Sequence, residues 1–153
     1  MINILDIFYS IIKEFKICIP ESKHYLGRLE EKVARPSFLY TMVFSKDTRS
    51  SYLFKDTMID LQIIYFGTTD KFGHENYEDR LTTINLLKQF LSQFNIQVKD
   101  RNLKFDYSFG EADEQLTINM QFKFKDELVN LDYNENQVRE KIREINYNKE
   151  VII

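Results

Sequence analysis

The sequence contains few of the residues from which many catalytic and cofactor sites are built. Among 153 residues there is one cysteine, Cys18, with four glycines, two prolines and no tryptophan. A single cysteine excludes an intramolecular disulfide, a CxxC redox pair and a cysteine-based metal cage. The glycines are isolated from one another, which excludes a glycine-rich phosphate-binding loop. These absences argue against enzymatic activity, and we expect no cofactor.

Long hydrophobic runs are also missing. No segment approaches the ~18 consecutive apolar residues that a membrane-spanning helix requires. The first residues include an acidic side chain, Asp6, and lack the basic segment and the small-residue cleavage site of a signal peptide. We therefore expect a protein that is made in the reducing cytoplasm and does not contact a membrane.

The sequence does contain many strand-forming residues, including 13 phenylalanines and nine tyrosines. Hydrophobic residues make up 43% of the chain and charged residues 29%, which excludes a disordered tail and favours one domain with a buried core. Lys and Arg number 21 and Asp and Glu 24, so the formal charge is −3. Nothing in this composition indicates a polyanion-binding protein.

Apolar spacing predicts two long helices and several strands. In chain order we expect a helix at 2–17, strands at 23–32 and 37–44, a polar turn at 45–51, a strand at 58–66, a loop at 67–76, a helix at 75–94, strands at 96–98, 103–109 and 116–125, and a short helix after 126. This order predicts an α+β fold, a mainly antiparallel β-sheet packed on one face by two long helices, plus a charged C-terminal helical extension. We assign 1–125 to a single domain and 126–153 to the extension.

Residue clusters that might suggest catalysis or metal binding lack the spacing those sites need. His24 and His74 are the only histidines, and neither belongs to an HxxxH or HExxH pattern. The acidic turn from Glu111 to Glu114 lacks the ligand alternation and the central glycine of a calcium loop. No serine, threonine or cysteine lies in a recognisable nucleophile elbow. We therefore predict no catalytic and no metal-binding residues.

Aromatic residues that alternate with lysines could suggest a nucleic-acid platform. Phe122 and Phe124 alternate with Lys123 and Lys125, as rings and charges do on single-strand binding proteins. Alternation along a strand, however, places the lysines on the face opposite the rings. The negative net charge also opposes this interpretation, and we do not expect specific nucleic-acid binding.

The charged extension has a narrow apolar stripe, formed by Val138, Ile142 and Ile145. Such a stripe is too narrow for a helix that stands alone, so the helix must dock on another surface. One possibility is its own domain. The other is a neighbouring subunit, to whose sheet edge the final residues 151–153 could add a strand.

One stretch of the sequence resembles a known family. Leu29 to Tyr40, with Arg-Pro-Ser-Phe at 35–38, follows an amphipathic helix and precedes Ile-Ile-Tyr-Phe at 63–66. This combination, with the order of elements through about residue 125, resembles the tail terminator (tail completion, neck) proteins of tailed phages and prophages of Gram-positive hosts.

The resemblance implies a structural virion protein. Such proteins form a hexameric ring that caps the finished tail tube, stops its polymerisation and joins the tail to the head-side neck. The implied partners are other copies of the chain, the tail tube protein, a neck or connector protein and, in a contractile tail, the sheath. DNA would pass through the ring without specific binding. The protein would be assembled in the host cytoplasm and lie at the neck end of the virion tail.

The resemblance also implies roles for individual residues. The family motif comprises Arg35, Pro36, Ser37, Phe38, Tyr65 and Phe66. In it, Arg35 would form a structural or interface ion pair and Pro36 would begin a strand, while the three aromatic residues would either anchor packing near the sheet or belong to the core. Candidate contacts with other subunits, tube or neck are Arg49, Lys71, Phe72, His74, Val138, Ile142 and Ile145.

Two alternatives to a tail terminator stay open. The chain could be another phage tail, neck or baseplate subunit, which would be a structural protein with different partners. It could also belong to a different class, such as a small intracellular binding module or an enzyme whose site lacks a recognisable motif.

Overall fold

The computed structural model describes residues 1–128, which form two helices and six strands. The elements are α1 (Ile4–Cys18), β1 (Lys23–Leu26), β2 (Ser37–Arg49), β3 (Phe54–Phe66), α2 (Tyr77–Leu91), β4 (Asn95–Val98), β5 (Arg101–Ala112) and β6 (Gln115–Glu127). The short helix predicted after 126, with its Val138, Ile142 and Ile145 stripe, lies outside the described residues. The last strand, β6, continues two residues beyond the domain end predicted at 125.

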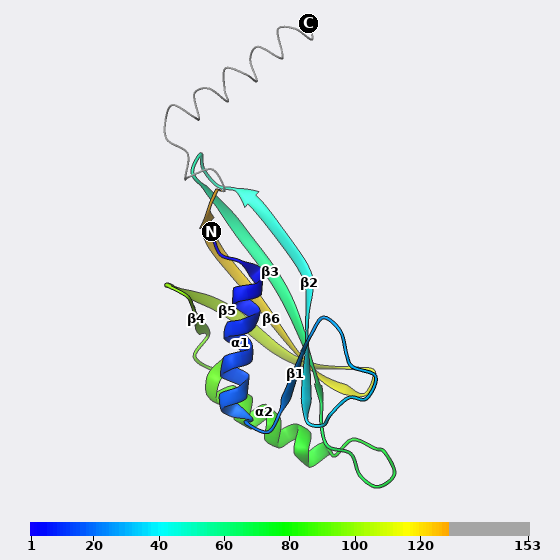
Figure 1. The fold of residues 1–153 in the computed structure, drawn as a ribbon. Coiled ribbons are helices and arrows are strands. Elements are labelled where there is room, and N and C mark those ends of the chain that lie inside the picture. The colour runs from blue at the N-terminus through cyan, green and yellow to red at the C-terminus, as the bar shows by residue number, and fades with distance from the viewer. Residues whose placement is uncertain (129–153) are drawn as a thin grey trace, which may run out of the picture.

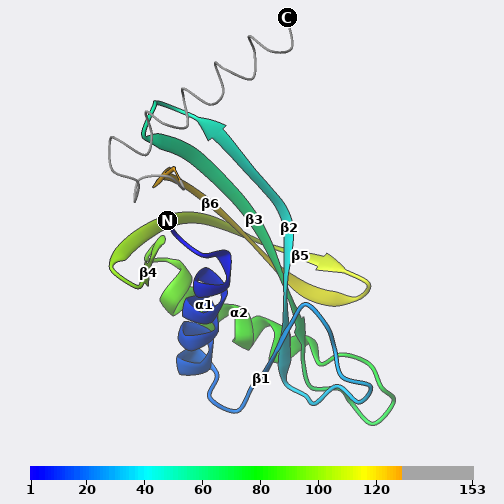
Figure 2. The same cartoon turned by 45° about the horizontal axis from the view of Figure 1, so that its top comes forward.

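The six strands form one curled, mixed sheet in the order β1-β2-β3-β6-β5-β4 (Figures 1 and 2). β1 runs parallel to β2, and the other neighbouring pairs are antiparallel. Strand accounts for 48% of the described residues and helix for 23%. The predicted fold class is therefore wrong: the protein is mostly one curled, mixed sheet with a parallel edge strand, and its two helices are short.

The parallel edge strand arises from the connection that follows β1. A single strand was predicted over 23–32, but β1 ends at Leu26, and Gly27 then adopts a φ of +74°, a conformation that glycine reaches without strain. Residues 27–36 carry the chain back to the end of the sheet at which β1 began. Lys23 consequently lies opposite Ser37, and β2 runs in the same direction as β1.

Both helices pack against the same face of the sheet, which curls around them (Figures 1 and 2). Asn3 and Asn76 cap α1 and α2, since each side chain accepts a hydrogen bond from a backbone amide in the first turn. Along β3 every second side chain is buried, as period-two alternation predicts. Each fully buried aliphatic or aromatic side chain contributes about 1.5–3 kcal/mol of hydrophobic stabilisation. The largest fully buried side chains are Tyr40, Tyr65, Phe15, Phe38, Phe122, Ile7, Ile11, Ile59, Leu61, Ile63, Leu87 and Leu91.

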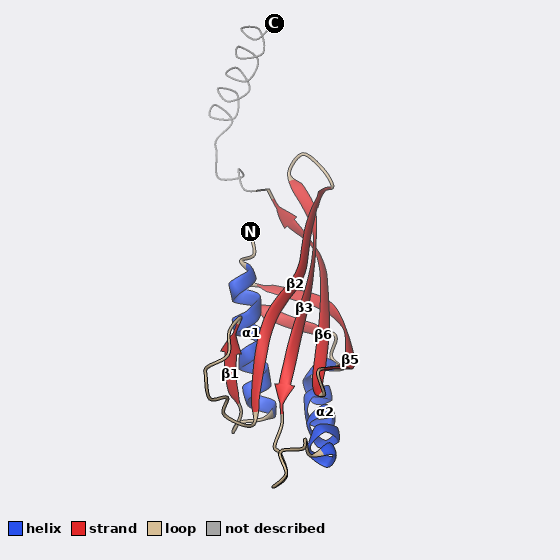
Figure 3. Cartoon of the chain, turned by 90° about the vertical axis from the view of Figure 1, so that its right-hand side faces the viewer, coloured by secondary structure: helices blue, strands red, loops and turns tan. Residues whose placement is uncertain are grey.

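A long hairpin of β2 and β3 extends beyond both helices (Figure 3). We call residues 44–58 of this hairpin the arm. The polar turn predicted at 45–51 is wrong, because β2 continues to Arg49. Cross-strand contacts explain how polar residues remain in the strand: Asp47 accepts hydrogen bonds from Thr57 at 2.7 Å and from Lys55 at 3.1 Å.

Candidate functional site

The two halves of the family motif meet at the end of the sheet opposite the arm. The first residues of β2 pair with the last residues of β3, so that Ser37 lies opposite Phe66 and Phe38 opposite Tyr65. Arg35 Nη1 donates a 2.8 Å hydrogen bond to the carbonyl oxygen of Gly67, and its guanidinium carbon lies 5.8 Å from the centre of the Phe66 ring. The motif therefore joins the start of β2 to the loop that follows β3.

The motif residues divide into buried and accessible groups. Phe38 and Tyr65 are essentially inaccessible to solvent, whereas Phe66 is half-buried. Pro36 immediately precedes β2, and its carbonyl oxygen accepts a 3.0 Å hydrogen bond from the Lys23 amide. Arg35 forms no ion pair within residues 1–128. In the isolated chain, Phe38 and Tyr65 thus stabilise the core, and Arg35, Pro36 and Phe66 offer accessible surface.

Replacing Arg35 by alanine is expected to lower the free energy of unfolding by about 1 kcal/mol, because the exposed guanidinium makes one hydrogen bond and one ring contact. Urea denaturation followed by circular dichroism measures the change. Arg28→Ala is the matched control, since Arg28 is exposed and should have little effect. Equal effects of the two substitutions would contradict a structural role for Arg35.

The loop at 67–76 presents three of the predicted contact residues. Asp70 shapes the loop, since its Oδ1 accepts hydrogen bonds from the Phe72 amide at 2.8 Å and the His74 amide at 2.9 Å. Phe72 is 73% exposed, and Lys71 Nζ lies 5.2 Å from its ring centre. His74 is also exposed. An exposed aromatic ring beside a cation is a surface that can contact another protein.

Arg49, the fourth contact residue within residues 1–128, is the last residue of β2, at the tip of the arm. The arm and the loop that follows β3 lie at opposite ends of the sheet (Figure 3). The Arg49 guanidinium donates to the carbonyl oxygens of Ser51 and Tyr52, and it stacks 5.7 Å from the Tyr52 ring centre. The structure therefore separates Arg49 from Lys71, Phe72 and His74. It places them at two ends of the molecule, where one copy could meet two different partners.

Sequence reasoning missed an apolar patch on the outer edge of β2. β1 pairs only with residues 37–40, so within residues 1–128 the remainder of β2 has β3 on one side and no strand on its outer side. Met42, Val43 and Phe44 are 49%, 64% and 43% exposed, and the register shifts between Met42 and Phe44. The available signal was the consecutive Met-Val-Phe run, which breaks the alternation expected of a half-buried strand.

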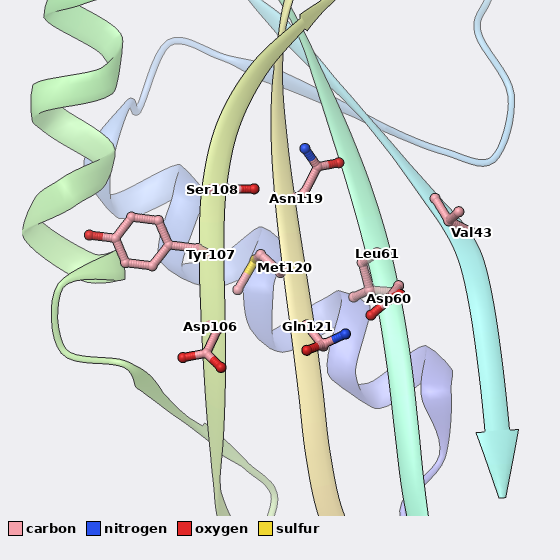
Figure 4. Close-up of a pocket in the computed structure, with 9 residues that line it drawn as sticks. All are labelled: Val43, Asp60, Leu61, Asp106, Tyr107, Ser108, Asn119, Met120 and Gln121. Atoms are coloured by element: carbon pink, nitrogen blue, oxygen red, sulfur yellow. The ribbon is translucent and has the colours of Figure 1, made fainter.

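The face of the sheet away from the helices, which we call the open face, is largely polar (Figure 4). Its central part is a shallow hollow of about 450 Å³. Its polar lining residues are Asp60, Asp106, Ser108, Asn119 and Gln121. This wide, open surface lacks the enclosed apolar walls of a small-molecule site.

Residues 1–128 contain neither a metal-binding cluster nor a membrane-spanning helix. No three side chains of histidine, cysteine, aspartate or glutamate come close enough there to hold a metal ion. No helix of that range has the length and apolarity needed to cross a membrane. The sequence matches no protein-family model. It also matches no curated protein. The distinctive surfaces of residues 1–128 are thus the unpaired edge of β2, the arm and the 67–76 loop.

His24 lies in a small polar cluster beside the core. Its Nδ1 is 2.7 Å from the Tyr40 hydroxyl and its Nε2 3.0 Å from the Ser22 hydroxyl, which itself donates to the carbonyl oxygen of Ile19. The ring also stacks on Phe38. Partial burial, with a smaller effect of the nearby Lys16 charge, lowers the pKa of His24 from 6.5 to about 4. His24 is therefore a neutral structural residue near pH 7.

This lowered pKa predicts a pH-dependent stability. The unfolded chain binds a proton at His24 below pH 6.5, whereas the folded chain does so only below about pH 4. The stability that the folded chain gains from a neutral His24 is therefore complete above pH 6.5. It is lost as the pH falls from 6.5 to about 4. Because the ring is partly exposed, we expect a loss of about 1–2 kcal/mol. Urea denaturation between pH 7 and pH 4 measures it.

His24→Gln, which cannot titrate, should be less stable at pH 7 and should show a weaker loss of stability on acidification. His74→Gln is the control, because His74 is exposed and its replacement should leave the dependence unchanged. The same pH profile in the wild-type and His24→Gln proteins would contradict the assignment.

Proposed function

We propose that this protein is a structural subunit of a phage tail, a tail terminator that forms a hexameric ring on the end of the tail tube. The observation that carries the proposal is that residues 1–128 contain two different stretches of unpaired sheet edge, one on β2 and one on β5. A closed ring requires two different surfaces on each subunit, one for each neighbour. Sheet edges can supply such surfaces through backbone hydrogen bonds.

The separation of the remaining accessible surfaces supports the same function. The arm carries exposed Tyr52 and Leu53 at one end, and the loop at 67–76 carries exposed Phe72 at the other. A subunit between tube and neck needs one surface for each. In this proposal the ring stops polymerisation of the tube protein and offers its other side to a neck or connector protein, with the sheath as a further partner in a contractile tail.

The position of the family motif is a second support. Arg35 and Phe66, from its two halves, contact each other at one end of the sheet, as a structural motif requires. The net charge of −3 favours a ring that surrounds DNA without gripping it, because DNA-binding surfaces need an excess of Lys and Arg. In this proposal the protein acts at the neck end of the virion tail, after assembly in the host cytoplasm.

Native mass spectrometry of the full-length protein, alone and mixed with tail tubes, tests the oligomeric part of the proposal. We expect a species of six copies of the 18.5 kDa chain, and six-fold rings in negative-stain images. A monomer at every concentration, with and without tubes, would contradict a ring. A stable dimer would favour a small intracellular binding module instead.

A further inference from the structure

The two unpaired sheet edges complement each other in length and direction. On β2, residues 41–49 extend beyond β1, which pairs only with residues 37–40. On β5, residues 106–112 extend beyond β4, which pairs only with residues 101–104. Successive antiparallel pairings through β3 and β6 make β2 and β5 run in opposite directions. If a second copy continued the sheet in the same orientation, the two edges would meet as an antiparallel pair.

We propose that residues 41–48 of β2 pair with residues 106–112 of β5 from a second copy of this chain, so that the sheet continues from subunit to subunit. The pairing rests on the proposed ring, because each copy uses one edge for each of its two neighbours. Head-to-tail pairing of unlike edges closes into a ring when the rotation between copies allows it, and otherwise forms a filament.

Charge complementarity identifies the second copy as the occupant of the β2 edge. The outer half of β2 carries Lys46 and Arg49, together with Asp47, which already pairs with Lys55. The unpaired part of β5 carries Asp106 and also Glu111, which already pairs with Arg80. Lys46 and Asp106 are exposed, and neither forms an ion pair within residues 1–128. Opposite charges on facing strands attract, whereas two β2 edges would bring like charges together.

One strand register both brings the opposite charges together and leaves room for an exposed aromatic ring. With Lys46 opposite Ser108, the Lys46 side chain reaches diagonally to Asp106, and both residues lie on the open face. The same register sets Phe44 opposite Gly110, which has no side chain and so leaves space for the 43% exposed ring. The extra residue at the β2 bulge allows the eight residues 41–48 to match the seven residues 106–112 in this register.

The alternative is that the outer edge of β2 stays exposed to solvent without a partner. A bulge and an outward lysine are devices by which proteins protect an unpaired strand from association. On β2, however, they accompany three exposed apolar side chains, Met42, Val43 and Phe44. A partner strand that covers these side chains removes their apolar surface from water, which stabilises the complex. This favours pairing of the edge over its permanent exposure to solvent.

Disulfide cross-linking of the full-length chain tests the pairing. In a Cys18→Ser background, which removes the only native thiol, the double variant Lys46→Cys, Ser108→Cys should form covalent multimers of up to six copies on mild oxidation. Each single cysteine variant should remain monomeric on a non-reducing gel. Lys123→Cys with Ser108→Cys is the matched control, because Lys123 is exposed on the interior strand β6.

The outcomes separate this inference from the proposed function. Six-copy assemblies without cross-links would overturn the edge pairing and leave the ring intact. Covalent dimers of Lys46→Cys alone would show pairing of two β2 edges, and would also overturn it. Cross-linked ladders that continue beyond six copies into filaments would support the edge pairing and contradict the capping ring. Monomers without cross-links, with and without tail tubes, would overturn both.

Charge exchange tests the register independently. Lys46→Glu and Asp106→Lys should each raise the concentration needed for assembly by about tenfold, because each places like charges close together. The double variant should return it close to the wild-type value. Lys123→Glu, a charge reversal away from both edges, should leave it unchanged. A double variant that assembles worse than either single variant would contradict the Lys46–Asp106 contact.

Discussion

Replacement of Phe38 by alanine is expected to lower the free energy of unfolding by about 3–5 kcal/mol, because it removes a fully buried ring and leaves a cavity. The Phe38 ring centre lies 5.2 Å from that of Phe15 on α1 and 5.0 Å from that of Tyr65 on β3. The ring therefore holds the first helix against the first long hairpin. A loss of this size is a large part of the stability of a small domain.

Urea denaturation of the Phe38→Ala protein measures this loss. Phe72→Ala is the matched control, since the Phe72 ring is 73% exposed and its removal should change stability by less than about 0.5 kcal/mol. The experiment also distinguishes the two roles open for the motif aromatics. Unchanged stability together with failed assembly would show that Phe38 is a subunit contact and not a core residue.

Asp126→Ala is expected to lower the free energy of unfolding by about 2–4 kcal/mol, because the Asp126 carboxylate is 97% buried and holds three segments together. It accepts hydrogen bonds from the Ile2 amide at 2.9 Å, from Arg101 Nη1 at 3.2 Å and from the Glu127 amide at 2.9 Å. Its loss leaves the partly exposed Arg101 without this partner and frees the chain before α1.

Thermal and urea denaturation report the size of the effect. Asp56→Ala is the control, because Asp56 lies on the exposed part of the arm and forms no ion pair within residues 1–128. We expect Arg101→Ala to cost less than Asp126→Ala, since it leaves the two amide hydrogen bonds in place. If Asp126→Ala were as stable as Asp56→Ala, the carboxylate would not link these segments.

Local patterns predicted the elements whose stability is local. The apolar spacing of 2–17 placed α1 to within two residues of its ends. Alternation placed β6 equally well, because one of its faces is buried and the other is not. These elements obey a single period over their whole length, so the sequence alone was sufficient.

The arm and the unpaired outer edge of β2 could not be predicted in this way. Residues 45–49 look like a turn because they are polar, and they remain in a strand only through partners on β3 such as Thr57. The parallel direction of β1 depends on how residues 27–36 return, which no periodicity encodes. Curling of the sheet and the exposure of Met42 to Phe44 likewise result from which strands become neighbours.

The family motif predicted which residues lie together better than it predicted what each residue does. Its two halves do meet, because β2 and β3 are adjacent and antiparallel. The sequence did not distinguish the buried Phe38 from the half-buried Phe66. Arg35 donates a hydrogen bond to the backbone of Gly67 and forms no ion pair within residues 1–128, so the interface ion pair stays a prediction. Contact residues at two ends of the molecule could be recognised only once the length of the hairpin was known.

Electron microscopy of tails made by a phage or prophage that lacks this protein tests the central claim most directly. Tail lengths and head attachment should be compared with those of the parent and of a strain complemented with the wild-type chain. We predict tails of uncontrolled, excessive length without heads, and recovery of both features on complementation. Tails of normal length that are already joined to heads would contradict the proposal that this protein caps the tube.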